Sequence, residues 1–141
     1  MITLPDADGH LRGRPLTVQD VEFDGTLEFL VSKTADWTAG ISGAINANAA
    51  FSDEGHARWV SVSGTVRLVD DRSKIQEMWS PLYGAWFEGP DDPDAVLLRF
   101  DADTADYWDA DANRVVRLAR MVKAAVTHDS DGVGDRGTLH P

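Results

Sequence analysis

The chain has 141 residues, no cysteine and a formal net charge of −11. The absence of cysteine excludes disulfides, thiolate metal sites and a cysteine nucleophile, and the negative charge argues against nucleic acid and anionic membranes as partners because it repels polyanions. The length suits a single domain covering residues 1–141. Since the sequence shows neither a signal-peptide pattern nor an apolar run of roughly 18 residues, a cytoplasmic protein is expected.

Short strands joined by tight turns are expected at the start of the chain. Asp8-Gly9 and Asp24-Gly25 are typical of hairpin turns, because glycine adopts a positive φ freely and aspartate tolerates it. Apolar residues in segment 32–44 are spaced for a short helix, although its two glycines each weaken a helix by roughly 1 kcal/mol relative to alanine. The strands expected in this part cover residues 1–4, 11–19, 26–31 and 46–52.

The segment from Trp59 to Asp109 has the clearest pattern. Apolar and polar residues alternate over 59–68, as in a strand with one buried face. A helix follows, because Asp70 and Asp71 supply an N-cap and negative charge for its first turn and Pro81 ends it. Its apolar positions are Ile75, Met78, Trp79 and Leu82. Two further strands are expected at 95–100 and 105–109.

The last part of the chain is less regular. Residues 113–126 fit either an amphipathic helix or a strand followed by a helix, and residues 128–141 are expected to form a loose tail. Six or more strands with one inserted helix predict a mainly β protein, with a small antiparallel barrel as its architecture. The four histidines are scattered without ligand spacing, so no metal site is predicted.

Several local patterns follow one another in a characteristic order. They are DADGHLRGRPLT near the start, FSDEGHARWVSVSGTVRLVDDRSKIQEMW in the middle, and then AWFEGPDDPDAVLLRF, ADYWD and VVRLARMVKA. In this order they resemble the flavin-binding split-barrel family related to pyridoxamine phosphate oxidase, and in particular its general stress protein branch. The resemblance implies a small antiparallel split β-barrel with inserted helices, a homodimer, and one flavin mononucleotide (FMN) at each end of the subunit interface. The helix that usually precedes the first strand in this branch is expected to be absent, because Met1 falls inside that strand.

The resemblance also implies which residues would hold the flavin. In the family an Arg-x-Arg-Pro strand runs along the cofactor, which here corresponds to Arg12, Arg14, Pro15, Leu16 and Thr17. Arginine presents a planar fork of donors that suits phosphate oxygens. The residues alone also fit a second interpretation, in which both arginines form the solvated face of a half-buried strand.

A second phosphate-contact region is implied at the end of the third strand, at Val31, Ser32 and Lys33. The lysine that the family commonly places a few residues later corresponds to Trp37 in this sequence. Either Lys33 takes over from a neighbouring turn, or phosphate binding has weakened or been lost; an ordinary strand-to-helix loop is the alternative. Trp108, in ADYWD, matches a position from which the family approaches the flavin.

These observations favour an FMN-binding general stress protein, with oxidoreductase activity of the pyridoxamine phosphate oxidase-like type as the enzymatic form of that hypothesis. No residue is an evident proton donor, so the catalytic residues stay unknown. The alternative is a cofactor-free split-barrel module that binds or interacts through a degenerate flavin site. A third hypothesis places a pyridoxal-type phosphate, or another small phosphorylated ligand, in the same cleft.

Overall fold

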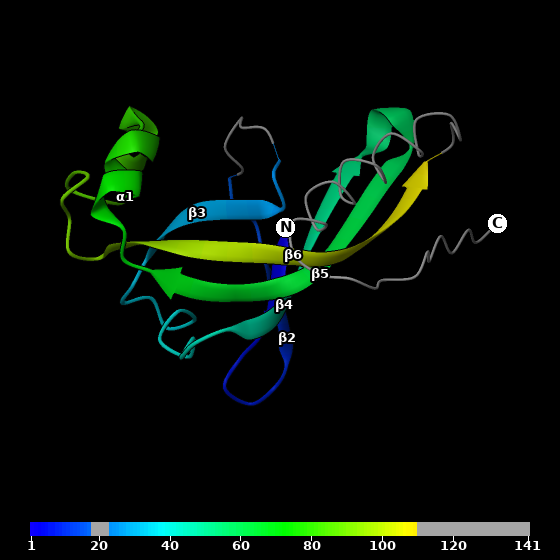
Figure 1. Cartoon of the computed structure of the whole chain (residues 1–141), viewed down its shortest axis with the longest axis horizontal. Helices are drawn as coiled ribbons and strands as arrows, with labels where there is room; N and C mark the ends of the chain where they lie inside the picture. Colours follow the sequence, from blue (N-terminus) through cyan, green and yellow to red (C-terminus); the bar gives the residue numbers. More distant parts are fainter. Residues whose placement is uncertain (18–22, 110–141) are drawn as a thin grey trace.

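Figure 1 shows the computed structural model of the chain, which describes residues 1–17 and 23–109. These residues form one six-stranded antiparallel sheet in the order β2-β1-β4-β5-β6-β3. The elements are β1 (Ile2–Pro5), β2 (Leu11–Arg14), β3 (Thr26–Ser32), β4 (Ile45–Asp53), the 3₁₀ helix η1 (Glu54–His56), β5 (Arg58–Val69), α1 (Arg72–Met78), the 3₁₀ helix η2 (Pro81–Ala85) and β6 (Ala95–Asp109). The predicted mainly β class is confirmed, whereas the expectations for 113–126 and 128–141 fall outside the described residues.

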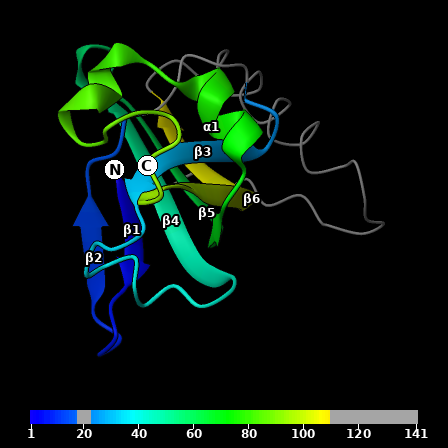
Figure 2. The ribbon, with the colours of Figure 1, turned by 90° about the vertical axis from the view of Figure 1, so that its left-hand side faces the viewer.

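The sheet curls around one apolar core, as the turned view in Figure 2 shows. Ile2 of β1 and Phe29 of β3 line the same small cavity with Leu16, although three strands separate β1 from β3 in the sheet order. The predicted alternation of β3 is confirmed, because Leu27, Phe29 and Val31 are all buried. A curled six-stranded sheet of this kind is half of a barrel, in agreement with a split-barrel architecture.

The two strands expected at 95–100 and 105–109 are one continuous strand, β6, of 15 residues. The predicted division of this segment into two strands is therefore wrong. A β-bulge lies between the two expected strands instead. Ser63 pairs with Thr104 and Gly64 pairs with Ala102, which leaves Asp103 as the extra residue. The strand therefore runs on past the bulge and reaches the far end of β5, where Figure 1 shows β4, β5 and β6 extending together away from α1.

The helix predicted in segment 32–44 does not form, and the chain makes a series of turns there. The buried Thr38 organises these turns, because its hydroxyl lies 2.8 Å from the carbonyl oxygens of Ser32 and Ala35. Gly43 has a φ of +87°, a value that ends helical geometry and favours glycine. Local side-chain bonding and a left-handed glycine thus outweigh the helical spacing of the apolar residues.

Helix α1 begins as predicted, because the Asp71 carboxylate accepts a hydrogen bond from the Lys74 amide at 3.0 Å. It ends earlier than predicted, at Met78, and Pro81 begins η2 rather than ending α1. Leu82 is 76% exposed, so its assignment to the apolar face of the helix is wrong. The residue before a proline disfavours helical backbone, and here both Trp79 and Ser80 are extended. No helix within the described ranges is long and apolar enough to span a bilayer.

Arg72 ties α1 to the start of β6, and its removal should destabilise the fold. Its guanidinium donates to the carbonyl oxygens of Asp92 at 2.7 Å and Ala95 at 2.8 Å. We expect Arg72→Ala to lower the free energy of unfolding by about 1.5–3 kcal/mol, because both carbonyls lose a charged donor. Urea unfolding followed by circular dichroism measures this change. Lys74→Ala, which removes only an exposed cation, should cost less than about 0.5 kcal/mol, and equal losses in the two variants would contradict the assignment.

Candidate functional site

An open groove of about 570 Å³ lies where the segment after β2 meets the extended ends of β4, β5 and β6. Three residues predicted to contact flavin, Pro15, Leu16 and Trp108, line this groove together. Its other lining residues are Met1, Ala50, Phe51, Ser52, Trp59, Val60 and Ser61. Volumes of roughly 300–1,000 Å³ with a mainly apolar lining are typical of small-molecule sites.

Two tryptophans form the aromatic part of the groove. Trp59 on β5 and Trp108 on β6 are direct cross-strand partners, so their side chains project from the same face of the sheet. They are 44% and 45% exposed, which is unusual for side chains of this size. Sequence reasoning missed Trp59, although its position on the polar face of an alternating strand already indicated an exposed aromatic ring.

Arg14 stands next to the groove and packs against Trp37. The guanidinium carbon lies 4.9 Å from the centroid of the indole ring, which is the geometry of a cation–π interaction. A guanidinium held over an aromatic ring keeps its charge and its N–H donors, so it can still bind an anion. Within the described part of the chain no carboxylate pairs with Arg14. The chain enters the groove directly after this cation, because the next residue, Pro15, is part of the groove lining.

Arg12 is engaged differently. Its Nε atom donates to Asp6 Oδ2 at 3.0 Å, and this hydrogen bond is the main reason that the pKa of Asp6 lies below its ordinary value. The structure therefore separates the two arginines of the Arg-x-Arg pattern. Arg12 has its own counterion, whereas Arg14 has none among the described residues.

The remaining predicted residues lie at the end of β3. Val31 is buried in the core at 4% exposure, and the segment that continues from it contacts Asp94 rather than the groove. The Lys33 amide donates to the Asp94 carbonyl oxygen at 2.8 Å, and the Thr34 amide donates to Asp94 Oδ1 at 2.8 Å. Hydrogen bonds from the Ser32 hydroxyl and from Thr34 hold the pKa of Asp94 below its ordinary value. Sequence reasoning missed Asp94 altogether.

The ten predicted cofactor-binding residues are thus not gathered in one place within a single chain. Ser32 pairs with Ala95 at the start of β6, whereas Trp108 lies 13 positions further along the same strand. That separation corresponds to roughly 40 Å of extended strand. Thr17, at the end of the first described segment, is exposed and lines no described pocket.

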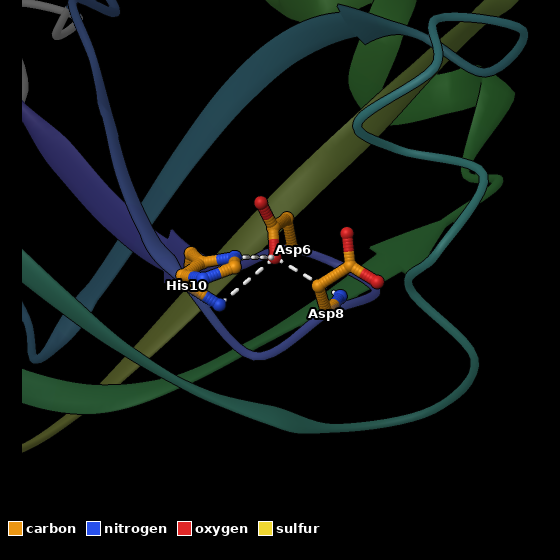
Figure 3. Close-up of side chains that lie close together, drawn as sticks. All are labelled: Asp6, Asp8 and His10. Carbon is orange, nitrogen blue, oxygen red and sulfur yellow. Dashed lines mark hydrogen bonds and ion pairs between the residues drawn. The ribbon is translucent and has the colours of Figure 1, made fainter.

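A separate polar cluster, Asp6, Asp8 and His10, lies in the turn between β1 and β2 (Figure 3). One ligand atom from each side chain falls within 4.8 Å of the others. The Asp6 carboxylate already accepts the amides of Asp8 at 3.0 Å and His10 at 2.9 Å, and it also pairs with Arg12. Its lone pairs are therefore used within the turn, and the cluster is explained as a turn-stabilising network.

Comparisons with known proteins give a consistent result. A family model described as "Pyridoxamine 5'-phosphate oxidase like" matches residues 1–131. The chain is 27% identical over 137 residues to Protein bli-3 of Neurospora crassa, which covers 90% of this chain and 66% of that protein. The chain therefore spans a little less than two thirds of the length of this curated relative.

Two crystal structures from Xanthomonas are also similar. A candidate general stress family protein from Xanthomonas campestris pv. campestris has a TM-score of 0.66 and 32% identity, over 99% of this chain and 86% of that chain. The general stress FMN/FAD binding protein of Xanthomonas citri has a TM-score of 0.64 and 30% identity, over 99% of this chain and 88% of that chain.

Proposed function

This chain belongs to the pyridoxamine 5'-phosphate oxidase-like family, and on that premise we propose that it is a flavin-binding general stress protein which, with FMN bound, acts as an oxidoreductase. The observation that supports this proposal is the groove, which is lined by two exposed tryptophans and by Pro15, the residue that follows Arg14; Arg14 has no carboxylate partner among the described residues. The similarity to the Xanthomonas citri protein, which is described as FMN/FAD binding, points in the same direction.

The chemistry of the groove suits the parts of FMN. Trp59, Trp108 and Phe51 offer flat apolar surface to an aromatic ring system, and the Ser52 and Ser61 hydroxyls offer polar contacts at its edges. Arg14, fixed by its ring stack, would hold the phosphate. A bound flavin would supply hydride transfer at its N5 atom, while the groove residues of this chain would bind and orient the ring.

We also propose a homodimer in which both subunits line each flavin. The separation of Ser32 from Trp108 along β6 supports this arrangement, because one chain alone does not bring all the predicted contacts to one ligand. The exposed Trp59, Trp108 and Met1 around the groove leave apolar surface that a second copy would cover. Sedimentation velocity should give twice the monomer mass of 15.4 kDa, and a monomer at moderate concentration would contradict a shared site.

The second candidate function is a cofactor-free interaction module. Two observations favour it: Arg12 is neutralised by Asp6, and the predicted phosphate contacts at Ser32 to Thr34 face the Asp94 carboxylate. In this case the groove would bind an apolar segment of a partner protein instead of a flavin.

Flavin titration distinguishes the two candidates. The purified protein, mixed with excess FMN and then freed of unbound ligand, should retain a visible flavin spectrum and show quenched tryptophan fluorescence. Trp108→Phe should reduce the quenching because Trp108 lines the groove, whereas Trp86→Phe should not, because Trp86 is 74% exposed and lines no described pocket. Pyridoxal 5'-phosphate added in competition tests the third hypothesis. If no flavin is retained at micromolar protein, the cofactor-free module is the better explanation.

A further inference from the structure

The turn that follows β3 has the donor groups of an anion site, and a carboxylate of the same chain faces them. The Thr34 amide donates to Asp94 Oδ1 at 2.8 Å, and the Ser32 and Thr34 hydroxyl oxygens lie 3.4 Å apart beside it. Lys33 adds a cation close enough to favour the ionised form of Asp94. Backbone amides, hydroxyls and a lysine are the groups that proteins use to bind phosphate.

Asp94 is held firmly in this position from both sides. Its carbonyl oxygen accepts the Lys33 amide at 2.8 Å, and its own amide donates to Asp92 Oδ1 at 2.8 Å. The turn is braced from below by the buried Thr38, whose hydroxyl bonds the carbonyl oxygen of Ser32. The backbone of Asp94 is thus held beside the turn, and the Thr34 amide orients its carboxylate.

A second anion cannot share these donors at low cost. The Thr34 amide has one hydrogen, which already points at a carboxylate oxygen, and the ionised Asp94 carboxylate would repel a phosphate dianion brought into contact with it. This turn is the region predicted from the sequence to contact phosphate. It therefore cannot bind phosphate as long as Asp94 is ionised.

We infer that the Asp94 carboxylate occupies the donor groups of this anion-binding turn and so keeps phosphate out of it. Arg14 is then the group that binds the negative charge of a ligand. The flavin part of this inference rests on the proposed function. The inference implies that most of the affinity for a flavin comes from contacts with its ring system, and that Arg14 alone distinguishes FMN from riboflavin.

The turn itself can be tested with inorganic phosphate, without any flavin. Phosphate is titrated into ¹⁵N-labelled protein at constant ionic strength, and the amide signals of Lys33 and Thr34 are followed. The wild type should show no saturable shift at these amides. Asp94→Ala, which removes the carboxylate, should show a saturable one. A saturable shift in the wild type, or none in folded Asp94→Ala, overturns the inference.

The flavin arm uses a variant that keeps the fold. Asp94→Asn retains an acceptor for the Thr34 amide and removes the charge, so it should raise the ratio of FMN affinity to riboflavin affinity about tenfold. Asp91→Asn removes an exposed carboxylate that bonds Gln76 rather than the turn, and its ratio should equal the wild-type ratio. An unchanged ratio in Asp94→Asn, or an equal rise in both variants, overturns the inference. If the wild type binds no flavin, the proposed function fails while the phosphate titration still decides the role of Asp94.

Discussion

Replacing Gly64 with alanine should lower the free energy of unfolding by about 3 kcal/mol or more, which for a chain of this size can abolish folding at 37 °C. Gly64 lies at the bulge between β5 and β6, and a Cβ atom there would clash with the Asp101 carbonyl oxygen and would lie 3.0 Å from Phe100 Cζ. The first of these contacts is with backbone, so the strand itself would have to move. Urea unfolding monitored by far-UV circular dichroism gives the change directly.

Gly40→Ala is the matched control for this prediction. Gly40 lies in the turns after β3, its φ is not positive, and a Cβ atom there meets nothing within 4 Å. The substitution should therefore change stability by no more than about 0.5–1 kcal/mol, with stabilisation as the expected direction because alanine restricts the unfolded chain. Similar unfolding curves for both variants would mean that β5 and β6 do not pack with this bulge.

Arg14→Ala should weaken FMN binding roughly ten- to a hundredfold, because a hydrogen bond to a charged group contributes about 1.5–3 kcal/mol. Riboflavin, which lacks the phosphate, should bind almost as well as before. The fold should be unaffected, since Arg14 is only partly buried and its one described partner is Trp37. Affinities follow from fluorescence titration with each flavin.

Arg12→Ala provides the control, because it removes the same charge two residues away. Arg12 is paired with Asp6, so its loss should change FMN affinity by less than about threefold. Arg14→Lys should fall between the two, since lysine keeps the charge but loses the planar stack on Trp37. Equal losses in Arg12→Ala and Arg14→Ala would show that the phosphate is held by overall charge and not by the residue at the groove.

The parts of the fold that sequence could predict are those in which one face of an element is buried. Leu27, Phe29 and Val31 alternate in β3 because only one side of that strand meets the core, and Asp71 caps α1 through a bond to an amide three residues away. Where the deciding contact is distant, prediction failed. The continuity of β6 depends on a bulge against Gly64, nearly 40 positions earlier, and no local pattern reports such a partner.

The same distinction applies to the candidate site. Arg14, Pro15, Leu16 and Trp108 were named because their local motifs resemble a family pattern, and the last three do line one groove. The sequence could not indicate which carboxylate pairs with which cation or amide. The pairing of Arg12 with Asp6 spans six positions and that of Thr34 with Asp94 spans 60. The β1–β2 hairpin brings the first pair together and the pairing of β3 with β6 brings the second together, and neither pairing is visible in a local sequence pattern.

The length of β6 has a consequence for association and solubility. Residues 97–101 have a neighbouring strand on both sides, whereas from Thr104 onward β6 pairs only with β5 among the described strands. Among the described residues, no strand pairs with the other side of this half of β6, and an uncovered strand edge is a template for pairing with other chains. Asp103 and Asp106 are exposed there. The negative charges of these carboxylates repel each other when two copies approach, which opposes the pairing of copies into an extended sheet. The face of the sheet that carries Trp59 and Trp108 stays available for specific contacts.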